Sequence, residues 1–154
     1  MVKITEKQER RFPGVAVDAI IRKENQIVIV QRKYPPHKDE WALPGGFIEL
    51  GERVEEAVLR EMKEETSLDV KIERLFNVYS DPDRDPRGHM ITIVYICNIL
   101  EGSPKIMGGD DAKVAKFIDL GEIKNVNLAF DHEKIITDYL NLKNGKIDDF
   151  VAIY

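Results

Sequence analysis

The sequence predicts an α+β fold, a layered α/β/α sandwich in which a mixed β-sheet packs between a central helix and a C-terminal helix. Segments rich in β-branched residues alternate with two segments whose apolar residues recur at helical spacing. The 154 residues contain no repeat, low-complexity tract or linker. We therefore expect residues 1–154 to form a single domain, large enough to bury a core without disulfides.

The expected strands begin with a β-hairpin of residues 15–21 and 26–31, which flank the polar turn Lys23-Glu24-Asn25. After the turn Leu43-Pro44-Gly45-Gly46 we expect a short extended segment at 47–49. Further runs of β-branched and aromatic residues predict strands at 70–79, 90–100 and 113–118.

Two helices are expected from the spacing of apolar residues. The first spans about 53–65, and the second spans 131–142, where Ile135, Ile136 and Tyr139 repeat at intervals of three to four. Together with the strands, these helices define the layered sandwich. The fold class by itself does not indicate an activity.

The composition is that of a globular protein, with 43% hydrophobic and 33% charged residues. The longest apolar run, 91–100, is interrupted by polar residues and is too short to span a bilayer. No signal peptide is visible, so we expect a cytoplasmic protein without a membrane segment. Cys97 is the only cysteine, which excludes an intramolecular disulfide and predicts a buried, inert thiol.

The net charge of −5 is concentrated in one segment. Residues 46–68 contain seven glutamates against Arg53, Arg60 and Lys63, which gives −4. A chain with this distribution is not expected to bind nucleic acid through a broad basic surface.

Three glutamates of the first expected helix share one face. Glu61, Glu64 and Glu65 are related as i, i+3 and i+4, and apolar residues project to nearly the same side. The acids therefore point inward or into a cleft, where they repel one another unless a cation joins them. Hard carboxylate oxygens suit Mg²⁺, with Mn²⁺ as an alternative. The competing interpretation is a solvated acidic helix, the commoner fate of a Glu-rich run.

The segment from Gly46 to Leu68 resembles the Nudix box of the Nudix hydrolase (MutT-like) family. The residues that match its spacing are Gly46, Glu52, Arg60, Glu61, Met62, Glu64, Glu65 and Leu68. Ser67 departs from the pattern, since the family has glycine there. If the left-handed conformation is kept, serine costs about 1 kcal/mol. The departure concerns the end of the helix and not the acidic residues.

The resemblance implies roles for the box residues. It makes Glu61, Glu64, Glu65 and the carbonyl of Gly45 the metal ligands, and it places the three glutamates and Arg60 in the catalytic machinery. In the family, the counterparts of Arg60 and Glu52 brace the preceding loop against the helix. Either glycine of the pair at 45–46 is also compatible with a simple turn after Pro44.

Four basic residues are candidates for binding substrate phosphates: Arg32, Arg84, Arg87 and His89. The last three lie in a loop that resembles one found in ADP-ribose pyrophosphatase-like Nudix proteins, although Asp83 interrupts the pattern here. A polar turn capped by its own aspartates is the alternative. His89 is also compatible with a plain strand-end role.

A few other residues have weaker signals. Trp41 is expected either to stack on a base or, more often, to pack in the core. Asp110 and Asp111 are expected in a turn or as an additional acid near the metal. His37 and His132 receive no functional assignment from the sequence.

The predicted function is Mg²⁺-dependent hydrolysis of the diphosphate bond of a nucleoside diphosphate derivative, with ADP-ribose or a similar nucleotide sugar as substrate. Alternatives are oxidised nucleoside triphosphates or RNA 5′ ends as substrates, a non-catalytic nucleotide sensor, or a metal-stabilised structural domain. No DNA-binding module is apparent. The apolar segment 150–154 is compatible with packing in a homodimer.

Overall fold

The protein is described by a computed structural model that covers residues 12–109 and 112–145. These residues form seven strands, two α-helices and one 3₁₀ helix. The elements are β1 (Gly14–Lys23), β2 (Gln26–Arg32), β3 (Trp41–Ala42), β4 (Gly45–Phe47), α1 (Val54–Thr66), β5 (Val70–Tyr79), β6 (Met90–Ile99), β7 (Ala112–Asp119), η1 (Ile123–Asn125) and α2 (His132–Lys143).

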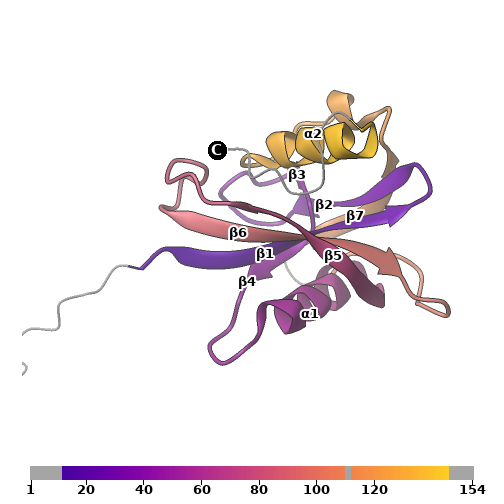
Figure 1. The fold of residues 1–154 in the computed structure, drawn as a ribbon, viewed down its shortest axis with the longest axis horizontal. Helices are drawn as coiled ribbons and strands as arrows, with labels where there is room; N and C mark the ends of the chain where they lie inside the picture. The colour runs from indigo at the N-terminus through magenta and orange to yellow at the C-terminus, as the bar shows by residue number, and fades with distance from the viewer. Residues whose placement is uncertain (1–11, 110–111, 146–154) are drawn as a thin grey trace, which may run out of the picture.

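The sheet is a layer between the two α-helices, with α2 on one side and α1 on the other (Figure 1). Its strand order is β3-β2-β1-β6-β5, with β4 also paired to β1 and β7 to β2. The sheet is mixed because β1 and β6 run parallel, whereas the other pairs are antiparallel. The fold class predicted from the sequence is confirmed.

Strands β1 and β2 separate soon after the hairpin that joins them. Their paired residues are confined to the turn end, Arg22 with Ile27 and Lys23 with Gln26. Farther along β1, residues 16–18 pair with β4 instead, while β2 pairs with β7 and β3. The sheet therefore opens between β1 and β2, and β4 crosses this opening toward α1.

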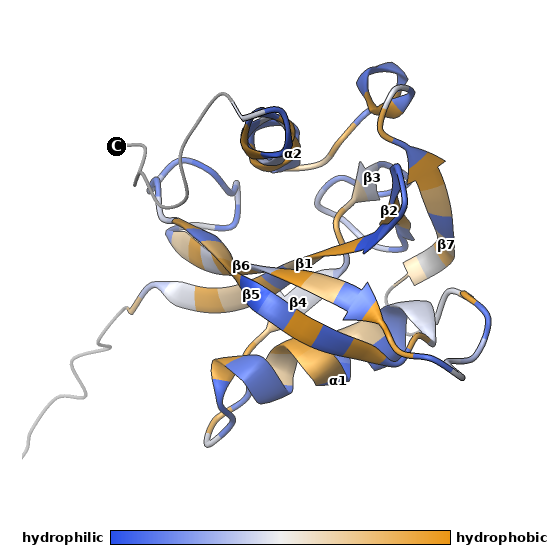
Figure 2. Ribbon diagram, turned by 45° about the vertical axis from the view of Figure 1, so that its right-hand side comes forward, coloured by the Kyte–Doolittle hydropathy of each residue, from blue (hydrophilic) through white to orange (hydrophobic). Residues whose placement is uncertain are grey.

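The core has two parts, one on each face of the sheet, because alternate residues of a strand face opposite sides. Val17, Ala19 and Ile21 of β1 pack in the cluster that contains the apolar face of α1. Ile20 packs in the cluster that contains Ile135, Ile136 and Tyr139 of α2. Figure 2 shows hydrophobic stretches on the strands that lie between the two helices. By the same alternation, Asp18 faces the side of α2.

Cys97 of β6 is fully buried in the cluster on the α1 side. Burial raises the pKa of its thiol to about 12, so the thiolate is absent at neutral pH. The prediction of a buried thiol is confirmed.

Most predicted elements are confirmed to within one or two residues at their ends, including both helices. The extended segment predicted at 47–49 is wrong in register, because the strand that pairs with β1 is Gly45–Phe47. The sequence did not indicate β3 or η1, which are only two and three residues long. Trp41 packs against the cluster on the α2 side and faces Lys116, so its core interpretation is confirmed. Asp110, Asp111 and the segment 150–154 lie outside the described residues.

Helix α1 ends at Ser67, which keeps the left-handed conformation with φ of 63°. Its backbone N–H donates to the carbonyl of Lys63 at 3.0 Å, as in a glycine-terminated helix. The serine in place of the family's glycine therefore adopts the backbone that favours glycine, at a cost of about 1 kcal/mol.

Within the described residues, no helix is both long and apolar enough to cross a membrane.

Candidate active site

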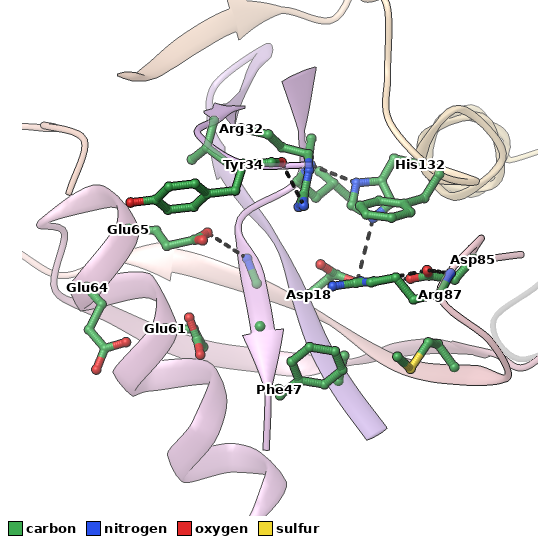
Figure 3. Close-up of a pocket in the computed structure, with 18 of the residues that line it drawn as sticks. Asp18, Arg32, Tyr34, Phe47, Glu61, Glu64, Glu65, Asp85, Arg87 and His132 are labelled. Carbon is green, nitrogen blue, oxygen red and sulfur yellow. Dashed lines mark hydrogen bonds and ion pairs between the residues drawn. The ribbon is translucent and has the colours of Figure 1, made fainter. Parts of the chain in front are cut away.

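A cavity of about 500 Å³ opens where β1 and β2 separate. This volume lies in the usual range of small-molecule sites. Its walls come from β1, β2, β4, α1, the β5–β6 loop and the start of α2 (Figure 3). The charged and aromatic residues that line it include Asp18, Arg32, Tyr34, Phe47, Glu49, Arg60, Glu61, Glu64, Glu65, Arg84, Asp85, Arg87, Phe130 and His132.

The three glutamates of α1 line one wall of this cavity. Figure 3 shows Glu61, Glu64 and Glu65 projecting from the same side of the helix. Glu65 is buried, the side chain of Glu61 is 12% exposed, and that of Glu64 is 39% exposed. All three acids line the cavity, with Glu61 and Glu65 largely shielded from solvent and Glu64 more exposed.

Arg60 connects the acidic wall to the loop that precedes α1. Its guanidinium donates to both carboxylate oxygens of Glu52, at 2.7 and 3.0 Å, and to the carbonyl of Phe47 at 3.0 Å. The hydrogen bonds from Arg60 lower the pKa of Glu52 to about 2, and those to Glu52 raise the pKa of Arg60. This bidentate pair fixes the end of β4 against the helix.

The remaining amino group of Arg60 faces the acids themselves. Nη1 donates to Glu61 at 2.7 Å and to Glu64 at 3.2 Å. Glu65 instead accepts the backbone N–H of Gly45 at 3.0 Å. Each carboxylate thus has a hydrogen-bond donor that offsets its repulsion from the other two.

The two glycines of β4 allow this close approach. A Cβ atom at residue 46 would overlap the carboxylate of Glu61, with Oε2 only 2.7 Å away. A Cβ atom at residue 45 would overlap the carbonyl of Val17 and lie 2.9 Å from Cα of Asp18. Both glycines have ordinary negative φ, so the absence of a side chain, and not backbone freedom, is what the site requires.

Among residues 12–109 and 112–145, no three His, Cys, Asp or Glu side chains are arranged as a group that could hold a metal ion. In this structure Glu61 and Glu64 accept hydrogen bonds from Arg60, and Glu65 accepts the N–H of Gly45. As a donor set, three carboxylates on one wall are hard oxygen ligands of the kind that Mg²⁺ and Mn²⁺ take. The metal role of these residues stays a prediction.

Arginines of the β5–β6 loop stand across the cavity from α1. Arg84 lines the cavity, but its buried guanidinium forms two hydrogen bonds with Asp131, at 2.8 and 2.5 Å. Arg87 pairs similarly with Asp85, at 3.0 and 2.7 Å, and its side chain is 37% exposed. Of the two, Arg87 is the more accessible to a ligand.

The other predicted cations differ in position. Arg32 lines the cavity, and its Nε donates to the carbonyl of Pro36 at 2.8 Å. His89 does not line it, because its Nε2 lies 3.1 Å from the carbonyl of Ser80 on the exposed loop. The structure therefore brings Arg32, Arg84 and Arg87 together at the cavity and leaves His89 outside it.

His132 and Asp18 also belong to the cavity wall, although neither was among the site residues predicted from the sequence. Nδ1 of His132 accepts the N–H of Leu43 at 2.9 Å, and Nε2 lies 3.8 Å from Asp18. Thr92 donates to Asp18 at 2.5 Å. Burial lowers the pKa of His132, which keeps the imidazole neutral with its proton on Nε2. The one available signal was an aspartate inside an apolar strand.

Comparisons with known proteins agree with this geometry. Residues 12–139 match the NUDIX domain family. The ADP-ribose pyrophosphatase of Methanocaldococcus jannaschii is 58% identical over 133 residues, which are 86% of this chain and 76% of that protein.

More distant relatives share the domain within longer chains. A bifunctional NMN adenylyltransferase/ADP ribose pyrophosphatase from Francisella tularensis, complexed with AMP and a Mn ion, has 37% identity and a TM-score of 0.78, covering 90% of this chain and 43% of that one. The ADPR responsive transcriptional repressor NtrR of Acinetobacter baylyi is 26% identical over 86% of this chain, which spans about half of the repressor's length (53%).

The mixed sheet between two helices, with a box of acids at a cavity, defines a nucleotide hydrolase domain of the Nudix class. The chain belongs to the NUDIX family. The family resemblance drawn from the residues between Gly46 and Leu68 is thereby confirmed.

Proposed function

We propose that this protein hydrolyses the diphosphate bond of ADP-ribose to AMP and ribose 5-phosphate, with Mg²⁺ as cofactor. The observation that carries the proposal is a single cavity with the Nudix-box glutamates on one wall and arginines on the other. Such a cavity suits a diphosphate, whose charge needs both a cation and hydrogen-bond donors. The pyrophosphatase that is 58% identical to this chain supports ADP-ribose as the substrate.

The residues that would hold Mg²⁺ are Glu61, Glu64, Glu65 and the carbonyl of Gly45. When bound, the ion polarises the diphosphate and lowers the pKa of the attacking water. The name of the Francisella relative, which includes a Mn ion, makes Mn²⁺ the alternative. One of the carboxylates of this wall accepts the proton of the water.

The other residues position the reactants. Arg60 holds Glu52 and the carbonyl of Phe47, so the end of β4 keeps its place beside the acids. Arg32 and Arg87 donate hydrogen bonds to the phosphates from the opposite wall, with Arg84 behind them as the partner of Asp131. The cytoplasmic location, the lack of a DNA-binding module and a homodimer stay predictions.

The test is a hydrolysis screen in Mg²⁺ with ADP-ribose, sugar nucleotides, dinucleotides, nucleoside triphosphates and capped RNA. We expect ADP-ribose to have the highest kcat/KM. Glu64→Gln should lower its kcat by at least about a hundredfold, because it removes a negative ligand and a candidate base. Glu101→Gln, an exposed acid outside the cavity, is the matched control and should retain wild-type kcat.

Two results would contradict the proposal. If Glu64→Gln leaves turnover unchanged, the acidic wall does not take part in the reaction. If the protein binds ADP-ribose but hydrolyses no substrate, it is a non-catalytic nucleotide sensor. The Acinetobacter relative is named as an ADPR responsive transcriptional repressor.

A further inference from the structure

Aromatic rings and guanidinium groups alternate from Phe47 at the end of β4 along the cavity wall opposite α1. The guanidinium carbon of Arg87 lies 5.1 Å from the ring centre of Phe47 and 5.1 Å from that of Phe130. The guanidinium carbon of Arg32 lies 4.8 Å from the same Phe130 ring. All four side chains line the cavity. We call Phe47, Arg87, Phe130 and Arg32 the arginine–phenylalanine row.

Polar partners hold each arginine of the row from behind. Asp85, whose side chain is 3% exposed, accepts from Nε and Nη2 of Arg87. Burial alone raises the pKa of Asp85, but the hydrogen bonds from Arg87 outweigh it, so the pKa is lowered and the carboxylate is ionised. The carbonyl of Pro36 accepts from Nε of Arg32. These partners anchor each guanidinium through its Nε.

Phe130 connects the two arginines and has an unusual backbone. Its φ is 54°, in the left-handed region that bulky residues avoid. Of the next two residues, Asp131 accepts from Arg84, and His132 accepts the N–H of Leu43. The turn before α2 thus places Phe130 and His132 in the cavity wall, with Asp131 as the partner of Arg84. Figure 3 shows His132 and Arg32 close together on this wall.

We propose that the arginine–phenylalanine row is the subsite for one phosphate of the substrate, and that Phe130 is its positioning residue. Phe130 sets the two guanidinium planes through cation–π contacts, so that their N–H groups converge on a phosphate. Asp85 offsets the charge of Arg87, so the directed N–H groups of the row contribute more to phosphate binding than its net charge does. This inference rests on the proposed function, since it assumes a diphosphate ligand.

The first test separates binding from chemistry. Phe130→Leu keeps apolar volume and removes the ring, and it should raise KM for ADP-ribose about tenfold, with kcat changed less than about threefold. Phe130→Tyr keeps the ring and should restore KM to within about threefold of wild type. The matched control is Phe117→Leu, because Phe117 also faces a cation, Lys23 at 5.2 Å, but lies outside the cavity.

The second test does not depend on turnover. Binding of an ADP-ribose analogue with a methylene group in place of the bridging oxygen is measured by calorimetry in Mg²⁺. Phe130→Leu should weaken it about tenfold in wild type and less than about threefold in a background that carries both Arg32→Met and Arg87→Met, because the ring acts through the two arginines. Equal losses in both backgrounds would show that Phe130 contacts the ligand itself and would overturn the positioning role.

The two proposals fail in different ways. If the wild type binds the analogue but hydrolyses no ADP-ribose, the proposed function fails and the row is still tested by the analogue. If the wild type hydrolyses ADP-ribose while Phe130→Leu and Arg87→Met both bind the analogue as wild type does, the row is not the subsite. A wild type that neither hydrolyses ADP-ribose nor binds the analogue overturns both.

Discussion

The two walls of the cavity are built from the chain in different ways. The acidic wall comes from one continuous stretch, in which the turn and strand at Gly45–Phe47 run into helix α1. The opposite wall combines Arg32, the loop around Arg87 and the turn at Phe130, and consecutive members of this set are 55 and 43 residues apart along the chain. A local motif therefore specifies the first wall, and tertiary contacts specify the second.

The walls also differ in how their charges are balanced. Across from α1, each of Arg84 and Arg87 has its own carboxylate partner. On α1, Glu61 and Glu64 share a single amino group of Arg60, whose other nitrogens are bound to Glu52 and Phe47. The acidic wall thus keeps an excess of negative charge, which favours a divalent cation there and phosphates beside the arginines.

The largest expected effect concerns the closest packing on the acidic wall. In Gly46→Ala, the new methyl group takes the position of the Glu61 carboxylate, the flexible end of a side chain. We expect kcat to fall about a hundredfold while the free energy of unfolding changes by less than about 1 kcal/mol. Kinetics and denaturant unfolding on the same sample check it. An unchanged kcat would show that the position of Glu61 is not critical.

Gly45→Ala is the matched substitution one residue away and should behave differently. Its methyl group meets backbone atoms, the carbonyl of Val17 and Cα of Asp18, which cannot swing aside. The strand must shift, so we expect a loss of about 1–3 kcal/mol in the free energy of unfolding. If Gly45→Ala is as stable as Gly46→Ala, the packing of β4 against β1 is looser than described.

A smaller effect is expected from His132 on the opposite wall, and it depends on pH. Burial lowers the pKa of His132 below its ordinary value of 6.5, so the unfolded chain binds this proton more readily than the folded one. The buried neutral His132 therefore makes its full contribution to the free energy of unfolding above pH 6.5, and this contribution is lost as the pH falls below 6.5.

His132→Gln should therefore lose less stability than wild type between pH 7 and pH 5.5. Thermal unfolding at a series of pH values measures the difference. Parallel curves for the two proteins would indicate that His132 titrates in the folded state as it does in the unfolded chain.

The sequence predicted the parts of the molecule that depend on local pattern. Helical spacing placed Glu61, Glu64 and Glu65 on one face, and alternation of β-branched residues located most of the strands. The left-handed backbone conformation considered for Ser67 is also present in the structure.

The parts that were missed depend on long-range packing. His132 is the first residue of α2, and only the packing of that helix brings it to Leu43, 89 residues away. Phe130 belongs to no sequence pattern, and Asp18 was marked only by its place inside an apolar strand. Arg84 is buried against Asp131, which lies 47 residues farther along the chain. A sequence motif shows which residues lie side by side on one helix or strand, but it does not show which residues of other elements pack against them.

The most direct measurement is a crystal structure of the protein with Mn²⁺, in which the anomalous signal locates the ion. We expect the ion to be bound by Glu61, Glu64, Glu65 and the carbonyl of Gly45, at distances near 2.0–2.5 Å. Arg60 should then have released Glu61 and Glu64 while keeping Glu52. An ion bound elsewhere, with both glutamates still on Arg60, would contradict the assignment of the acidic wall.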